Sequence, residues 1–187
     1  MEPINAVLET MLARWRSEGD IIVFTNGVFD LLHAGHVTYL KGARKLGHRL
    51  VVGVNSDSSV RMLGKGPERP INDEGSRKVV LEALRSVDAA VVFSTETPLD
   101  LIKQIRPDVL VKGGDYDAAT RDLNAPSYIV GAHEVSEYGG KVAVIPFLAG
   151  HSTTAMLQKS RTQGCGGFLK VLCKALKWVR IRPSLLP

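Results

Sequence analysis

The stretch that decides the fold reads Ile21-Ile22-Val23-Phe24-Thr25-Asn26-Gly27-Val28-Phe29-Asp30-Leu31-Leu32-His33-Ala34-Gly35-His36. Its first four residues are apolar without alternation, which is typical of a strand covered on both faces of a parallel sheet. Gly27 permits a tight turn, and Gly35 lets a helix begin against a ligand with no Cβ in the way. The free N–H groups of that helix point toward the strand end. The stretch therefore predicts a phosphate site.

The rest of the chain repeats the order of strand and helix. Four more short apolar runs predict strands at 49–54, 89–93, 108–111 and 141–146, and helical patterns lie at 36–46, 73–86, 98–105, 128–138 and 152–161. This order predicts one α/β domain, a Rossmann-like doubly wound parallel sheet of about five strands including 21–24. Ligands of such sheets bind at the carboxyl ends of the strands, near the point where strand order reverses.

The sequence divides into three segments. Residues 1–20 are expected to form an N-terminal helix, residues 21–161 the α/β domain, and residues 162–187 a basic tail. The apolar face of the first helix is predicted to carry Ile4, Val7, Leu8, Met11, Leu12 and Trp15.

Composition narrows the class of protein. The 187 residues are 44% hydrophobic and 23% charged, as expected of one globular domain. No apolar run is long enough for a membrane span, and charges interrupt residues 1–20, unlike a secretory signal. Cys165 and Cys173 form neither a disulfide framework nor a zinc site. We therefore expect a cytoplasmic protein.

The net charge of +5 is unevenly spread. Residues 1–160 hold 18 Lys and Arg against 19 Asp and Glu, whereas residues 161–187 hold six basic residues and no acid. The near-neutral body offers no general field that attracts phosphate backbones. No nucleic-acid partner is expected.

His33 and His36 are the first candidates for chemistry. Three residues apart, they lie on one face of a first helical turn. Two imidazoles beside backbone donors suit a phosphoryl group in transfer, whose charge needs fixed donors. The pair is open to a second interpretation as metal ligands, although no third ligand stands at a local spacing. His48 and His133 are interpreted as structural or surface residues.

The pattern G-x-F-D-x-x-H-x-G-H at 27–36 resembles the signature of the nucleotidyltransferase superfamily with the H-x-G-H motif. Class I aminoacyl-tRNA synthetases carry a similar element, but this chain is too short for one. Four further elements resemble the superfamily: Asn55-Ser56-Asp57, Arg69-Pro70-Ile71-Asn72 leading to Arg77, Lys112-Gly113-Gly114-Asp115-Tyr116, and Gly150-His151-Ser152-Thr153-Thr154. Over residues 20–160 the chain is most similar to heptose-1-phosphate adenylyltransferases, which make ADP-heptose for the inner core of lipopolysaccharide.

The resemblance implies transfer of AMP from ATP to heptose 1-phosphate with release of pyrophosphate. It also implies Mg²⁺, held mainly by the triphosphate and water rather than by protein ligands, and a homo-oligomer. The expected catalytic residues are His33, His36, Lys65 and Arg77. The expected nucleotide-binding residues are Thr25, Asn26, Gly27, Phe29, Asp30, Lys112, Gly113, Asp115, Ser152 and Thr153.

Several alternatives stay open. Asp115 also suits a capped turn, Ser152 a helix N-cap without ligand, and Lys65 and Arg77 solvated surface charges. Two rival functions remain, a cytidylyltransferase acting on glycerol 3-phosphate or phosphoethanolamine, and a nucleotide-binding module without turnover. Residues 117–128 form a longer connection than the family pattern has, which affects the acceptor pocket.

The tail carries helical spacing of Phe168, Leu169, Val171, Leu172, Ala175, Leu176 and Val179, with lysines mostly opposite. This pattern predicts a basic amphipathic helix. Packing on the body or on another subunit, disorder, and docking on an anionic membrane surface all fit it.

Overall fold

The structure is a computed structural model that describes residues 4–64, 66, 68–114, 116–118, 120, 122, 125–148, 150–151, 153 and 156. Contacts divide the chain into units 1–150 and 151–187, and every element named below belongs to the first unit. In the described part of the chain, no helix combines the length and apolarity that crossing a bilayer requires.

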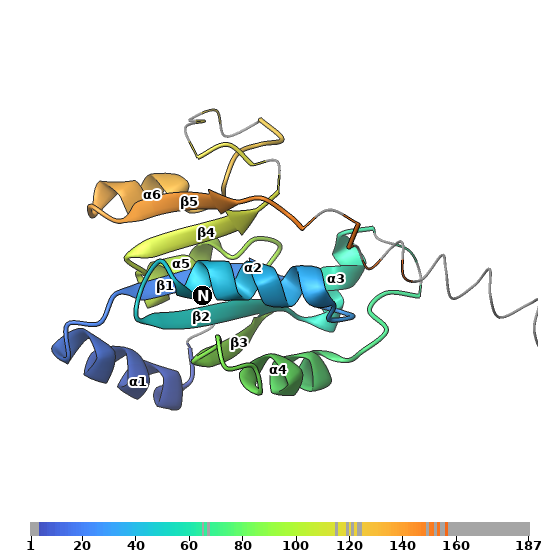
Figure 1. Ribbon diagram of the computed structural model, residues 1–187, viewed down its shortest axis with the longest axis horizontal. Helices are drawn as coiled ribbons and strands as arrows, with labels where there is room; N and C mark the ends of the chain where they lie inside the picture. Colours follow the sequence, from blue (N-terminus) through green and yellow to red (C-terminus); the bar gives the residue numbers. More distant parts are fainter. Residues whose placement is uncertain are drawn as a thin grey trace, which may run out of the picture. The chain divides into compact units, whose positions relative to one another are not determined.

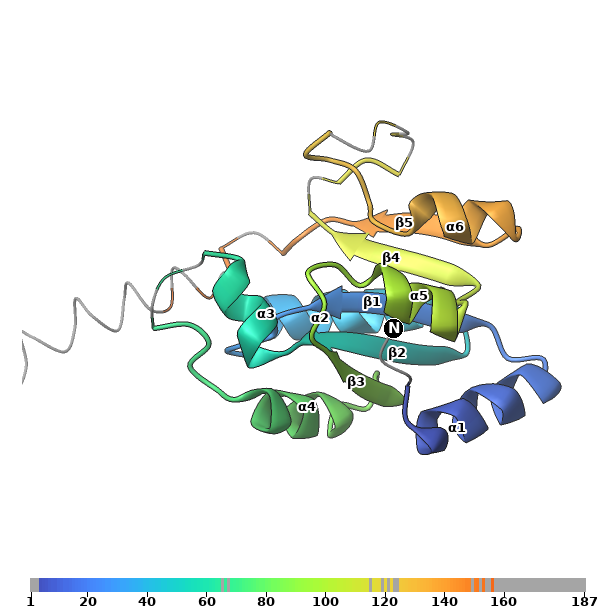
Figure 2. The same cartoon turned by 180° about the vertical axis from the view of Figure 1, so that it is seen from behind.

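Five parallel strands form one sheet in the order β3-β2-β1-β4-β5 (Figures 1 and 2). The strands are β1 (Ile22–Gly27), β2 (Arg49–Asn55), β3 (Ala89–Phe93), β4 (Val109–Gly113) and β5 (Lys141–Ile145). The helices are α1 (Ala6–Ser17), α2 (Ala34–Arg44), α3 (Asp57–Met62), α4 (Glu74–Glu82), α5 (Leu99–Ile105) and α6 (Ala132–Glu137). The predicted doubly wound parallel fold is confirmed.

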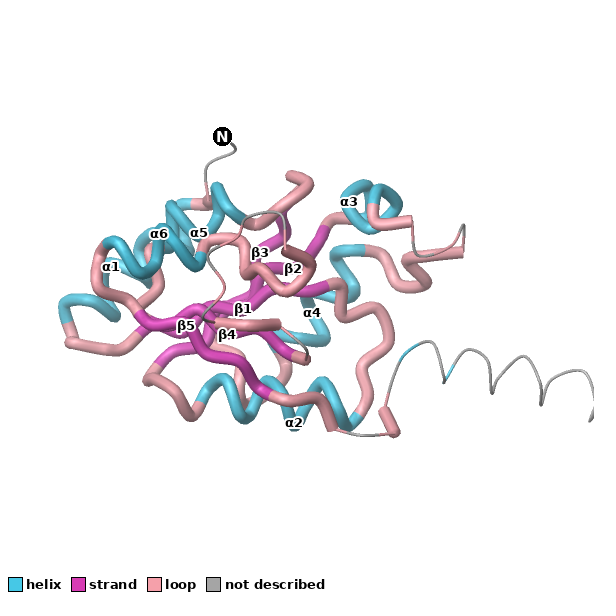
Figure 3. The backbone as a smooth tube through the Cα atoms, turned by 90° about the horizontal axis from the view of Figure 1, so that it is seen from above, coloured by secondary structure: helices cyan, strands magenta, loops and turns pink. Residues whose placement is uncertain are grey.

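Helices cover both faces of the sheet (Figure 3). On one face, α1, α5 and α6 pack against alternate strand residues such as Ile22 and Phe24. On the other face, α2 and α4 pack against the intervening residues, of which Val23 is one. The strands therefore have no polar face, which explains their unbroken apolar runs.

Some element predictions need correction. β1 continues to Gly27 instead of ending at Phe24, because its pairing with β2 extends to Gly27 opposite Val54. Helix α2 begins at Ala34, two residues before the expected start. Val7 was expected on the buried face of the first helix, but it is 70% exposed. Most of the expected helix 152–161 and all of the tail 162–187 lie outside the described residues.

Candidate active site

The candidate site lies where strand order reverses. The chain passes from β1 through β2 to β3 and then crosses back to β4, which pairs with the other edge of β1. The carboxyl ends of β1 and β4 are therefore neighbours, and the loop from β1 leads into α2 (Figure 1). This is the position at which open parallel sheets bind ligands.

A tight turn links β1 to α2. Phe29 has a φ of 49°, a left-handed conformation that is uncommon for a residue with a Cβ. Its ring folds back over Gly27, where a Cβ would stand 3.0 Å from the ring. A glycine at position 27 thus relieves a tight contact with the ring of Phe29, in addition to allowing the approach of a ligand.

The structure brings the two motif histidines together. Their rings are stacked with centroids 3.9 Å apart and an interplanar angle of 23°. His33 is the N-cap of α2, and its Nδ1 accepts a long hydrogen bond of 3.4 Å from the backbone N–H of His36. A neutral ring that accepts at Nδ1 carries its hydrogen on Nε2. His33 can therefore cap the helix and still act as a donor.

His36 is held as a neutral imidazole. Its pKa is lowered to about 4, first because the ring is partly buried and then because His33 lies beside it, while a backbone hydrogen bond with Leu31 opposes the shift. Its Nδ1 is buried and has no hydrogen-bond partner in the described part of the chain. The ring of Phe29 packs against it edge to face at 5.5 Å. A neutral ring supplies one N–H donor at physiological pH.

Lys112 and Asn26 meet across the point of strand reversal. The Nζ atom of Lys112, on β4, donates a 2.5 Å hydrogen bond to Oδ1 of Asn26 on β1. Burial lowers the pKa of Lys112 to about 8. This ammonium group is fixed at the sheet edge where the α2 N-terminus also lies, which suits an anionic ligand.

The glycines after Lys112 make room for an aromatic ring of the chain itself. A Cβ on Gly113 or Gly114 would stand 2.5 Å or 2.4 Å from the ring of Phe147, whose side chain is 66% exposed. The sequence suggested only a ligand above these glycines. Phe147 gave no sequence signal, because it follows β5 in a short loop.

Thr25 turns inward. Its hydroxyl pairs with that of buried Tyr39 at 2.6 Å, and the Tyr39 hydroxyl also donates to the carbonyl of Val111. The side chain of Thr25 is fully buried, so the expected contribution of this residue to phosphate binding is left to its backbone.

Arg77 and Asp30 were expected to face a ligand, but the structure places their charged groups against other parts of the chain. Both are buried, with 2% and 3% exposure, and their polar atoms contact other parts of the chain. Arg77 pairs with Asp57 at 2.7 Å, and Asp30 pairs with Arg69 at 2.7 Å. Asp57 and Arg69 lie within two of the sequence elements that resemble the superfamily, but no individual role is predicted for either from the sequence.

Lys65, Asp115 and Ser152 lie outside the described residues. Thr153 belongs to the second unit, where it occupies a helical, half-buried position. Among the described residues, no group of three or more His, Cys, Asp and Glu side chains could hold a metal ion.

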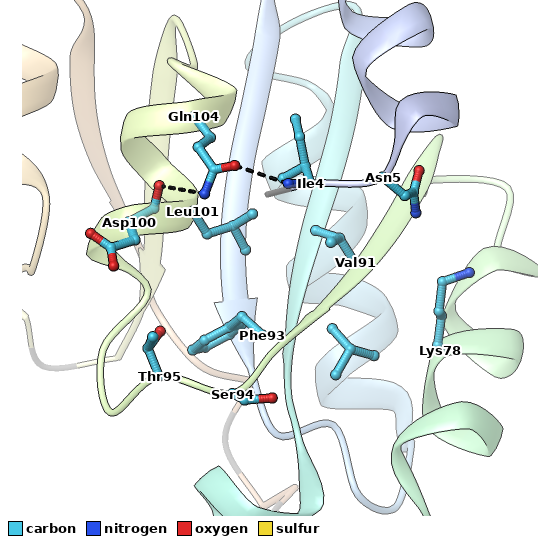
Figure 4. Close-up of a pocket in the computed structure, with 11 residues that line it drawn as sticks. Ile4, Asn5, Lys78, Val91, Phe93, Ser94, Thr95, Asp100, Leu101 and Gln104 are labelled. Atoms are coloured by element: carbon cyan, nitrogen blue, oxygen red, sulfur yellow. Dashed lines mark hydrogen bonds between the residues drawn. The ribbon is translucent and has the colours of Figure 1, made fainter. Parts of the chain in front are cut away.

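A pocket of about 280 Å³ opens elsewhere, beside the edge strand β3 (Figure 4). Its walls come from β3, α5, Lys78 of α4 and the residues preceding α1. Gln104 of α5 joins its helix to the residues preceding α1 by accepting a hydrogen bond from the backbone N–H of Ile4. None of the predicted site residues in the described part of the chain lines it.

A stacked histidine pair at the N-terminus of the helix after the first strand, beside a half-buried lysine at the point of strand reversal, is an arrangement that suits an α/β domain that binds phosphate. The chain belongs to the cytidylyltransferase-like family, whose model matches residues 24–158, and it is a nucleotidyltransferase. The predicted membership of the nucleotidyltransferase superfamily is confirmed.

Relatives agree with this assignment. The chain is 51% identical over 152 residues to the bifunctional protein HldE of Magnetococcus marinus and 54% identical over 155 residues to that of Methylobacillus flagellatus. Each match covers 81% of this chain but only 29% and 30% of the relative, so the chain spans about a third of their length. Among solved structures, the lipopolysaccharide core biosynthesis protein of Thermoplasma volcanium matches with a TM-score of 0.53 and 34% identity, over 70% of this chain and 98% of that one.

Proposed function

We propose that the chain transfers the adenylyl group of ATP to heptose 1-phosphate and releases pyrophosphate. The observation that carries the proposal is the stacked His33–His36 pair at the start of α2, beside the Lys112 ammonium. The relatives support it, because two are named bifunctional protein HldE and one is named a lipopolysaccharide core biosynthesis protein.

The reaction needs donors more than it needs a base. An oxygen of the sugar phosphate attacks the α-phosphorus in line, a new P–O bond forms, and the bond to the β-phosphate oxygen breaks with its electron pair leaving on pyrophosphate. A phosphate monoester is already an anionic nucleophile, so the enzyme contributes mainly orientation and stabilisation of charge.

The residues of this chain fit those two tasks. Imidazole N–H groups of His33 and His36 would donate to the triphosphate, and the Lys112 ammonium would neutralise charge that grows on the leaving group. A neutral His36 suits this role, since it keeps an N–H donor without placing a positive charge beside His33. The expected charge contribution of Lys65 remains part of the proposal.

Mg²⁺ would enter as part of the substrate, bound to ATP. Mg²⁺ commonly keeps several waters and binds through substrate phosphates. The side chain of Asp30 is not available to it, because both carboxylate oxygens already contact protein groups. The described residues are therefore compatible with a metal ion held mainly by the triphosphate.

A pyrophosphate-release assay tests the proposal. The purified chain is incubated with ATP or CTP and with heptose 1-phosphate, glycerol 3-phosphate or phosphoethanolamine in turn. We expect release only with ATP and heptose 1-phosphate, and a loss of about 10²- to 10³-fold in kcat for His36→Ala, the usual effect of removing one fixed donor. Turnover with CTP would favour the cytidylyltransferase alternative. ATP binding without pyrophosphate release on any acceptor would favour a binding module.

A further inference from the structure

The turn between β1 and α2 is held by a polar network that the proposed chemistry does not use. It joins the turn after β1, the start of α3, the segment 69–73 and helix α4. Two ion pairs form its centre, Arg77 with Asp57 and Arg69 with Asp30. Side-chain exposure is 1% for Arg77 and 0% for Asp30.

Arg77 uses its guanidinium to join three separate segments. One Nη donates to the carbonyl of Val28 at 2.7 Å, the other donates to Asp57 at 2.7 Å, and Nε donates to the carbonyl of Asn72 at 2.9 Å. A buried guanidinium is stable only when its donors are satisfied, and here all three nitrogens have partners. Arg77 is therefore not a cation that reaches toward a substrate.

Asp30 fixes the other side of the same turn. Its Oδ1 accepts from the backbone N–H groups of Ile71 and Asn72 at 2.8 Å and 3.0 Å, while Oδ2 lies 2.7 Å from Nε of Arg69. The Asn72 side chain returns a 2.6 Å hydrogen bond to the carbonyl of Asp30. Segment 69–72 is thus held against the turn by both backbone and side chain.

Phe29 stands between these two anchors. On the N-terminal side of Phe29, the network donates a hydrogen bond to the carbonyl of Val28. On its C-terminal side, the network donates to both the carboxylate and the carbonyl of Asp30. Phe29 has a positive φ, which is unfavourable for a residue with a Cβ and persists only where the surroundings impose it. Its ring packs edge to face on His36, 5.5 Å between centroids.

We infer that Arg77 and Asp30 are positioning residues, which hold the left-handed turn at Phe29 and through its ring fix the orientation of His36. The effect on rate rests on the proposed function, while the effect on His36 does not. Neither residue contacts substrate, so their loss should misplace a donor and leave most of the ATP-binding surface in place.

The chain offers a matched control at the opposite end of the sheet. Asp88, just before β3, accepts from Nε of Arg44 at 3.0 Å and from the backbone N–H of Leu50 at 2.8 Å. This ion pair also joins three segments, yet it lies at the amino ends of the strands. Asp88→Asn should lower stability without changing His36.

The experiment compares Arg77→Lys, Asp30→Asn, Phe29→Leu and Asp88→Asn. Thermal unfolding records stability, NMR titration of the imidazole of His36 records its environment without substrate, and steady-state kinetics with ATP and heptose 1-phosphate records function. Phe29→Leu removes the ring edge and leaves every buried charge paired, so it keeps the test valid where a network variant fails to fold.

We expect Arg77→Lys, Asp30→Asn and Phe29→Leu to move the pKa of His36 from about 4 toward its ordinary value. We also expect kcat to fall by about 10- to 100-fold while the KM for ATP changes by less than about threefold, since small misplacements of reacting groups are costly. Folded variants with an unchanged His36 titration and unchanged kcat would overturn the inference. A shifted titration in a chain that transfers no nucleotide would support the positioning role and reject only the proposed function.

Discussion

The protonation of single side chains sets the chemistry of this site. His36 and Lys112 are pushed toward neutrality, and burial is the first cause in both cases. Bound phosphate would oppose both shifts, because negative charge favours the protonated form. The free protein and its complex with ATP should therefore titrate differently, which makes pH the sharpest probe at the scale of the residue.

The first prediction concerns His36 and acid stability. The pKa of this group is about 4 in the folded chain and 6.5 as its ordinary value. Between these values the unfolded chain binds a proton that the native chain does not, so the free energy of unfolding falls as pH drops from 6.5 to 4. His36→Gln should remove this contribution.

Urea unfolding of both proteins across this range checks the prediction. The stability of the native protein relative to the variant should increase steadily as the pH rises toward 6.5. His48→Gln serves as the control, since His48 is an exposed residue at the far end of the sheet. Parallel pH profiles for the native protein and His36→Gln would show that His36 is not held neutral.

The second prediction concerns Lys112 and alkaline pH. Burial lowers its pKa to about 8, so the free protein loses this positive charge as pH rises through that value. Because kcat/KM reports the free enzyme, its profile should fall above about pH 8. Lys112→Arg keeps the charge and should remove this alkaline limb, at a lower absolute rate because the 2.5 Å contact with Asn26 changes.

The measurement is kcat/KM for ATP over the alkaline range. A profile of Lys112→Arg that falls at the same pH as the native profile would assign the limb to another group. Lys112→Met should be slow and flat across the range, since it carries no charge at any pH.

The individual roles of the buried charged residues could not be predicted from the sequence. Arg77 donates to Val28, 49 positions away, and to Asp57, 20 positions away. No local pattern records these contacts, so an arginine in an amphipathic helix was interpreted as a phosphate ligand or a surface charge. By contrast, the meeting of His33 and His36 was predicted from their spacing of three residues, although His33 is the extended N-cap of α2 and does not belong to its first turn.

At the scale of elements, strands were predicted more accurately than helices. The run at 89–93 coincides with β3, since a short apolar segment that contains two valines suits a strand buried on both faces. Helix α3 was not predicted, because its six residues show no full amphipathic period. It is fixed by its surroundings, with Ser56 capping it and Glu74 accepting from the backbone N–H of Asp57.

The third prediction belongs to the ends of β4 and β5. Gly113→Ala would place a Cβ 2.5 Å from Phe147 and 3.0 Å from Tyr39, which should destabilise the fold by about 1 to 3 kcal/mol through overpacking. Phe147→Ala alone should cost little, because that side chain is 66% exposed. In the double variant Gly113→Ala/Phe147→Ala, the added methyl group should lower the free energy of unfolding by less than it does when Phe147 is present.

A double-mutant cycle from chemical denaturation measures the coupling. Gly42→Ala is the control partner, since its added Cβ would meet Ile145 and not Phe147, and its effect should add to that of Phe147→Ala. Additive effects for Gly113→Ala as well would mean that the glycine does not serve the packing of Phe147. The reasons left for a glycine at position 113 would then be the ring of Tyr39 and the approach of a ligand.

At the scale of the whole molecule, the excess positive charge and the sequence elements of the nucleotidyltransferase superfamily lie in different parts of the chain. The five sequence elements that resemble the nucleotidyltransferase superfamily end at Thr154, and the family match ends at residue 158. The excess of positive charge lies in residues 161–187. Packing on the body or a second subunit, disorder and membrane docking remain the three predictions for this tail, which is outside the described residues.

The fourth prediction follows from this separation. A chain truncated after Arg161 keeps all five elements and loses the five basic residues of 162–187. We therefore expect it to keep most of its nucleotidyl-transfer rate. Its specific activity is compared with that of the full chain at equal concentration. A soluble, folded and inactive truncation would show that the tail completes the active site, either within one chain or from a second copy. Activity that returns when an inactive His36→Ala full chain is added would assign that contribution to a second copy, because the added chain brings a tail but no working site of its own.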